Sequence, residues 1–103
     1  MEKVIDGKHY SSRNAEEIGS RKKGIQGDFD RVRETLYRTE NGRYFLQGYG
    51  GARSKYAKKN KHGDLMDGSD LIALSDEEAL SWAERHLDGA KVKDEFEDMV
   101  EPA

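Results

Sequence analysis

Alternating hydrophobic and polar positions are clearest on the two sides of Asn41-Gly42. The segments RVRETLYRTE and RYFLQGYG flank this dipeptide and are rich in residues that favour strands. Asparagine and glycine both tolerate the left-handed backbone of a two-residue hairpin turn. We therefore predict a central antiparallel hairpin over residues 31–49, in which Tyr37 faces Leu46. Both faces of this hairpin carry apolar side chains, which predicts a central position in the sheet.

A helical repeat of apolar residues is clearest in the segment SDEEALSWAERHLDG. Ser75 and Glu78 form a capping box at its start, and Gly89 is a typical stop signal. We therefore predict the main helix at about residues 75–87, with Trp82 at the contact between helix and sheet. The preceding segment DLIALS has the composition of a further strand.

The two ends of the chain carry shorter patterns. Asp6-Gly7 predicts a small hairpin near the N-terminus. In the segment SSRNAEEIGSRKKG, polar capping residues precede Ala15 and Ile18, which predicts a short N-terminal helix. Residues 91–103 are rich in acidic side chains and lack a periodic apolar face, so we expect a flexible acidic tail there.

These elements predict one α+β domain over residues 1–90, with a small antiparallel sheet, one main helix and a short N-terminal helix. A chain of 103 residues supports a single modest core. It contains no cysteine, which excludes disulfides, thiolate catalysis and metal sites built on sulfur. The first ten residues, MEKVIDGKHY, contain no long apolar run, so we expect neither a signal peptide nor a membrane span, and a cytoplasmic location.

The net charge of −3 conceals a strong asymmetry along the chain. Residues 21–61 contain twelve lysines and arginines against four acidic residues. Residues 62–103 contain three against thirteen. An acidic half joined to a basic half suits a protein that docks on a nucleoprotein complex.

A glycine-rich turn and a basic run follow the central hairpin in the segment YFLQGYGGARSKYAKKNKHG. The glycines match neither the G-x-x-x-x-G-K-[ST] pattern nor the G-x-G-x-x-G pattern of phosphate-binding loops. They therefore favour a bulge and a sharp exit from the strand over a nucleotide site. Tyrosines interspersed among lysines and arginines are typical of binding surfaces. We predict that a partner binds the residues of this segment that are aromatic or basic, which are Tyr49, Arg53, Lys55, Tyr56, Lys58, Lys59 and Lys61.

Catalytic and metal-binding patterns are weak by comparison. The histidines at positions 9, 62 and 86 lie on three different predicted elements. Glu77 and Glu78 are explained by the start of the main helix, where acidic side chains are stabilised by the helix dipole. We therefore predict no catalytic residue, no metal site and no cofactor.

Three segments carry a resemblance to a known group of proteins: DGKHY, ETLYRTENGRYFLQGYGGARSKYA and GSDLIALSDEEALSWAERH. Together they resemble a family of short, mostly uncharacterised bacterial proteins found on phage and plasmid-like elements. The resemblance covers roughly residues 6–87. This chain departs from the family pattern at Gln47 and Tyr49, where the pattern has histidine and glutamate. Since those are the two best catalytic candidates, their replacement favours binding over catalysis.

The resemblance implies a function in the bacterial host cell, because some small proteins of such elements, anti-CRISPR inhibitors among them, bind host defence complexes. We expect a stoichiometric protein-binding inhibitor of a CRISPR-type nucleoprotein complex. A nucleic-acid-binding accessory protein that uses the basic stretch 53–61 is the alternative. An enzyme with an unrecognised site is the third possibility.

Overall fold

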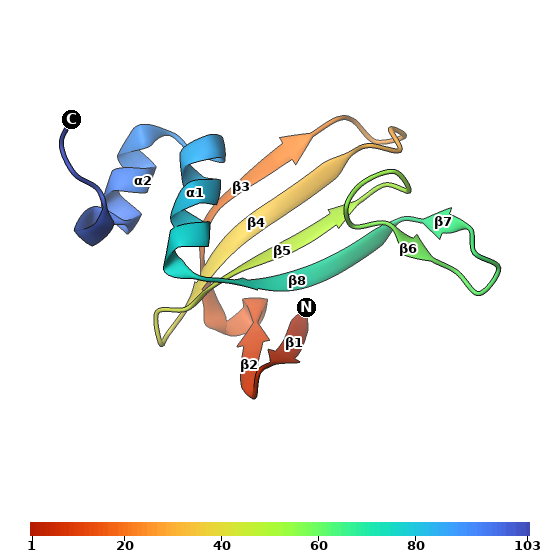
Figure 1. The fold of residues 1–103 in the computed structure, drawn as a ribbon, viewed down its shortest axis with the longest axis horizontal. Helices are drawn as coiled ribbons and strands as arrows, with labels where there is room; N and C mark the ends of the chain where they lie inside the picture. The colour runs from red at the N-terminus through yellow and green to blue at the C-terminus, as the bar shows by residue number, and fades with distance from the viewer.

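The computed structural model describes residues 1–103 and places a four-stranded antiparallel sheet at the centre of the molecule (Figure 1). Its strands run in the order β3 (Ala15–Lys23), β4 (Val32–Thr39), β5 (Tyr44–Gly50) and β8 (Gly68–Leu74). Two small hairpins accompany it, β1 (Glu2–Ile5) with β2 (Lys8–Ser11), and β6 (Lys58–Lys59) with β7 (Leu65–Met66). The helices are α1 (Asp76–His86) and α2 (Gly89–Glu95), and the 3-10 turns are η1 (Ser12–Asn14) and η2 (Glu97–Met99). The expected α+β class is confirmed.

The two faces of the sheet carry different covers. On one face, Trp82 of α1 packs with Leu36 and Leu46 in the larger hydrophobic cluster. On the other face, Tyr10 of β2 packs edge-on against Phe45, with their ring centroids 5.6 Å apart. The sheet is therefore the middle layer between helix and hairpin, as the apolar side chains on both of its faces predict.

The central hairpin and the main helix are both confirmed. β4 and β5 form the hairpin, and β8 leads directly into α1. Ser75 and Glu78 form the predicted capping box, in which the Glu78 backbone N–H donates to Ser75 Oγ at 3.1 Å. The Asp6-Gly7 turn also forms, with positive φ angles at both residues.

The predicted pairing within the central hairpin is wrong by one residue. Tyr37 lies opposite Phe45 instead of Leu46, and Leu36 lies opposite Leu46. Because side chains alternate along a strand, a shift of one residue exchanges the two faces. Leu36 consequently points to α1 and is fully buried, while Tyr37 points to the β1–β2 hairpin.

The turn explains this shift. The Thr39 backbone N–H donates to the Arg43 carbonyl at 2.8 Å, so three residues and not two form the loop. Gly42 has a φ of 82°, whereas Asn41 has a negative φ. A turn with a single left-handed residue, placed after the first two loop positions, is the usual three-residue alternative to the two-residue loop.

The predicted N-terminal helix is wrong, because residues 15–23 form β3. This strand pairs with β4 along its whole length, with a shift in register between Glu17 and Gly19. A β-carbon added at Gly19 would lie 2.6 Å from Leu87 Cδ2, so the glycine leaves room for Leu87 to pack on the strand. Pairing with a central strand outweighs the local capping signals.

The acidic segment expected to be a flexible tail contains α2 and packs on the core. Val92 and Phe96 are 7% and 3% exposed. The Phe96 ring stacks on Tyr44 at 5.2 Å, and the Tyr44 hydroxyl donates to Glu95 at 2.6 Å. Two apolar residues four positions apart suffice to anchor one helical turn, although they are too few to produce a recognisable apolar stripe. The expectation of a tail is wrong for this part of the chain.

Gly42→Val should lower the free energy of unfolding by about 1 kcal/mol or more, because a β-branched residue resists a positive φ. No atom lies within 4 Å of the added β-carbon, so the cost reflects backbone strain alone. Asn41→Val is the matched control and should cost less, since its φ is negative. Urea denaturation measures both variants, and equal effects would contradict the assigned turn.

Phe96→Ala should destabilise the protein by about 3 kcal/mol, as expected for an aromatic side chain removed from a core. Met99→Ala, at a residue that is 37% exposed, should cost less than about 1 kcal/mol. Thermal and urea denaturation followed by circular dichroism test both values. A Phe96→Ala variant as stable as the parent would show that this segment does not pack on the core and would favour a flexible tail instead.

Candidate functional site

The loop after β5 folds back over the sheet. The ring of Tyr56 lies over Gly48, where an added β-carbon would lie 2.1 Å from Tyr56 Cζ. Gly50 leaves room for Ser54 in the same way, with 2.2 Å between the added β-carbon and Ser54 Oγ. β5 pairs with both neighbours without a register shift, so the expected bulge does not form. These glycines instead allow the close approach of a covering loop.

Below this loop, the carboxylate of Glu34 on β4 accepts hydrogen bonds from four side chains. Arg21 Nε and Trp82 Nε1 donate to its Oε1 at 2.8 and 3.1 Å. The Tyr56 hydroxyl donates to its Oε2 at 2.5 Å, and Lys55 Nζ lies 2.6 Å from the same oxygen. Glu34 is fully buried, and its partners come from β3, α1 and the loop. One carboxylate therefore joins three separate parts of the chain.

The donors decide the charge state of Glu34. Burial by itself would raise its pKa, but the hydrogen bonds from Lys55, Tyr56, Trp82 and Arg21 outweigh this effect and lower the pKa to about 2. Glu34 is therefore ionised at neutral pH. Burial and the hydrogen bond to Glu34 raise the pKa of Tyr56, which stays protonated as the donor.

His86 is the titratable side chain on α1 that lies against this network, with its ring 5.1 Å from that of Trp82. Burial and the positive charge of Arg21 lower its pKa. The oxygens of Glu34 are occupied by donors and inaccessible, so neither is free to accept a proton from a substrate. The arrangement stabilises the fold.

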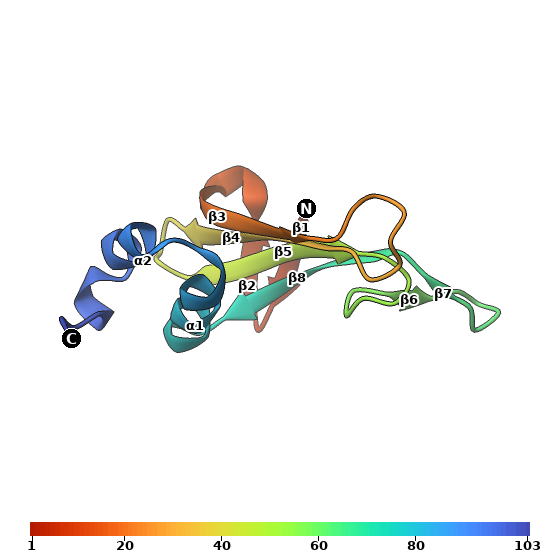
Figure 2. The ribbon, with the colours of Figure 1, turned by 90° about the horizontal axis from the view of Figure 1, so that it is seen from above.

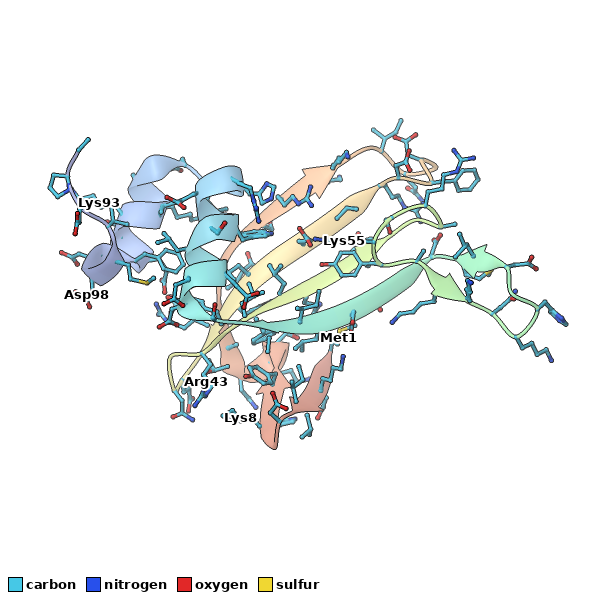
Figure 3. The ribbon with its side chains drawn as sticks, in the orientation of Figure 1. Met1, Lys8, Arg43, Lys55, Lys93 and Asp98 are labelled. Atoms are coloured by element: carbon cyan, nitrogen blue, oxygen red, sulfur yellow. The ribbon has the colours of Figure 1, made fainter.

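The predicted partner-binding role of Tyr56 requires correction. Direct contact with a partner requires an accessible side chain, but Tyr56 is 3% exposed and its hydroxyl donates to Glu34. Lys55 lies beside it, 5.4 Å from the ring centroid, and faces the solvent between α1 and the loop (Figure 3). Both residues therefore hold the loop on the sheet.

The other predicted binding residues lie on different elements of the fold. Arg53 lies over the exposed ring of Phe29, with 5.7 Å between the guanidinium carbon and the ring centroid. Lys58, Lys59 and Lys61 lie on the projecting β6–β7 hairpin (Figure 1). Tyr49 lies on the sheet face opposite to Tyr56, because odd and even positions of β5 face opposite ways.

Tyr49 has basic neighbours that the sequence interpretation missed. Arg33 of β4 lies directly opposite Tyr49, and Lys22 of β3 lies directly opposite Arg33. All three residues are exposed. With the loop between β3 and β4 they line a hollow of about 350 Å³. Pairing the strands in the correct order would have revealed this row, but β3 was predicted as a helix.

Gln47 lies on the same sheet face as Tyr49, because both occupy odd positions of β5. Its Oε1 is buried and accepts no hydrogen bond.

The fold separates charge along its longest axis, which measures 50 Å (Figure 1). The acidic helix α1 and the acidic residues 94–101 lie at one end, and the β6–β7 hairpin and the β3–β4 loop lie at the other. Several basic side chains at the hairpin end make no ion pair, namely Lys22, Lys23, Arg33, Arg53, Lys58, Lys59 and Lys61. We call this surface the basic end.

No protein-family model, curated protein or solved structure matches this chain. No helix combines the length and apolar character needed to cross a bilayer. No group of three or more histidine and acidic side chains comes together as a metal site.

Protonation of Glu34 at low pH should lower the free energy of unfolding of the protein. Its pKa is about 2 in the folded protein and 4.5 ordinarily, so its ionised form stabilises the fold by about 3 kcal/mol above pH ~5. This contribution is lost as the pH falls from 4.5 toward 2. Urea denaturation between pH 7 and pH 3 should show the free energy of unfolding of the parent protein falling. In Glu34→Gln, the part of this decrease that comes from protonation of Glu34 should be absent.

Two variants complete this test. At neutral pH, Glu34→Gln should cost about 3 kcal/mol or more, because it leaves Arg21 without its buried partner. Tyr56→Phe keeps the carboxylate and the ring, so it should fold, lose about 1–2 kcal/mol and retain the acid dependence. An unchanged acid profile in Glu34→Gln, or a Tyr56→Phe variant as stable as the parent, would contradict the network.

Proposed function

We propose that this chain is a stoichiometric binding protein that inhibits a bacterial nucleoprotein complex of the CRISPR type in the cytoplasm. The observation that carries the proposal is the basic end, where basic side chains without ion pairs gather around exposed aromatic rings. Phe29 is 58% exposed and Tyr49 is 49% exposed. Arginine and aromatic side chains are enriched at binding hot spots.

The position of the basic end also supports binding. It lies at the far end of the long axis from helix α1 and the acidic residues 94–101, so their charge does not compensate it locally. Over such distances, solvent screens exposed charges from one another at physiological salt. A negatively charged partner therefore meets a local positive field despite the net charge of −3.

The residues expected to carry binding are revised accordingly. Arg53 and Tyr49 remain as anchors, and Lys58, Lys59 and Lys61 remain as rim charges that set the association rate. Tyr56 and Lys55 act indirectly, because they hold the loop that presents Arg53. The alternative of a nucleic-acid accessory protein uses the same charges but requires no protein partner.

The experiment captures bacterial nucleoprotein complexes from lysate on the immobilised protein, and then titrates the protein against the recovered complex. We expect nuclease activity to fall linearly and to end at a fixed molar ratio. A triple variant with Lys58, Lys59 and Lys61 changed to glutamate should shift the midpoint at least tenfold. The matched control changes Arg85, Lys91 and Lys93 to glutamate at the acidic end and should leave the midpoint unchanged.

The outcomes separate the alternatives. Loss of activity that continues with time at substoichiometric protein would indicate an enzyme. Capture of nucleic acid alone would favour the accessory protein. Equal effects of the two triple variants would contradict the basic end as the docking surface.

A further inference from the structure

The sheet face that bears Tyr49 is partly uncovered. The β1–β2 hairpin packs on this face around Phe45 and Leu71. Beyond it, toward the basic end, Lys22, Arg33 and Tyr49 form a row across three adjacent strands. Each side chain lies directly opposite the next, which brings neighbouring β-carbons to about 5 Å. The row is therefore a compact, exposed platform.

The two basic side chains in this row have no ion-pair partner, although Asp28 and Asp30 lie on the neighbouring β3–β4 loop. Lys22 and Arg33 lie directly opposite each other, and like charges in this position destabilise a sheet. Neither side chain makes an ion pair, whereas Arg31 nearby is bound by Asp67 at 2.5 Å. A local arrangement that opposes folding marks a functional position more often than a structural one. An anionic ligand would relieve the repulsion between the two residues.

The loop between β3 and β4 turns this platform into a hollow. It extends beyond the strand ends on both sides of the sheet, one of which is the side opposite to α1 (Figure 2). Ile25, which is 72% exposed, lies on this loop and lines the hollow together with Tyr49 and the basic row. The volume of about 350 Å³ accommodates a planar group of the size of a nucleobase with its phosphate.

We infer that this hollow binds single-stranded nucleic acid, with a base stacked on Tyr49 and the flanking phosphates bound by Lys22 and Arg33. Aromatic rings presented by an antiparallel sheet among basic side chains are the usual platform for unpaired bases. A duplex has no free base face to offer to Tyr49. The inference rests on the proposed function and extends it. It identifies the nucleic acid of the nucleoprotein complex as the component that this hollow contacts.

The test uses the full chain and a fluorescein-labelled mixed-sequence 12-nucleotide single strand, as DNA and as RNA, with fluorescence anisotropy as the readout. We expect saturable binding at low salt that weakens steeply as salt rises. Tyr49→Ala should weaken binding about tenfold, whereas Tyr49→Phe, which keeps the ring, should stay within about twofold. Arg33→Ala should also reduce the slope of the logarithm of the binding constant against the logarithm of the salt concentration by about 0.7.

Lys93→Ala is the matched control, because it removes one positive charge from α2 at the opposite end of the molecule (Figure 3). It should bind like the parent protein. Circular dichroism verifies that every variant is folded. The comparison of the two oligonucleotides shows whether the hollow prefers DNA or RNA. Binding of either one, with the expected loss of affinity in Tyr49→Ala, supports the inference.

Three results would overturn it: no binding of either strand, equal affinity of the parent protein and Tyr49→Ala, or a duplex of the same sequence bound as tightly as the single strand. If Tyr49→Ala loses inhibition of the nucleoprotein complex while no oligonucleotide binds, the platform contacts protein instead. In that case the inference fails and the proposed function stands. Oligonucleotide binding without inhibition of any complex supports the inference and contradicts the proposed function.

Discussion

The buried carboxylate of Glu34 is the constraint on which the rest of this structure depends. It is fully buried, and four donors from β3, α1 and the loop after β5 surround it. A buried charge is tolerated only when it is paired and hydrogen-bonded, so the chain must bring all of these elements to one point. Glu34 thereby specifies where α1 lies on the sheet and how the loop folds.

This arrangement gives the two faces of β5 different surroundings. On the face toward α1, Gly48 makes room for Tyr56, whose hydroxyl reaches Glu34. On the other face, Tyr49 is exposed next to Arg33. Because alternate residues of one strand serve opposite faces, the loop can be locked down without covering the basic row. The rigid network supports the platform from behind.

Local chemistry made much of the fold predictable. The hairpin over residues 31–49, the Asp6-Gly7 turn and the capping box at Ser75 depend on interactions between residues close in sequence, and all three form. The candidate site was only partly predictable. The asymmetry of charge located the basic segment, but Tyr56 resembled an exposed anchor because its burial depends on Glu34, 22 positions away in the sequence.

The sequence by itself determined the fold class, the central hairpin, the main helix and the separation of basic from acidic residues, because each depends on composition or on short-range backbone preferences. Only the tertiary structure decided the rest. Residues 15–23 became a strand because β4 offered an unpaired edge, and Phe96 joined the core because Tyr44 lay within reach. Lys22, Arg33 and Tyr49 became one row because three strands paired in register. Contacts between residues far apart in the chain depend on packing, which no local pattern encodes.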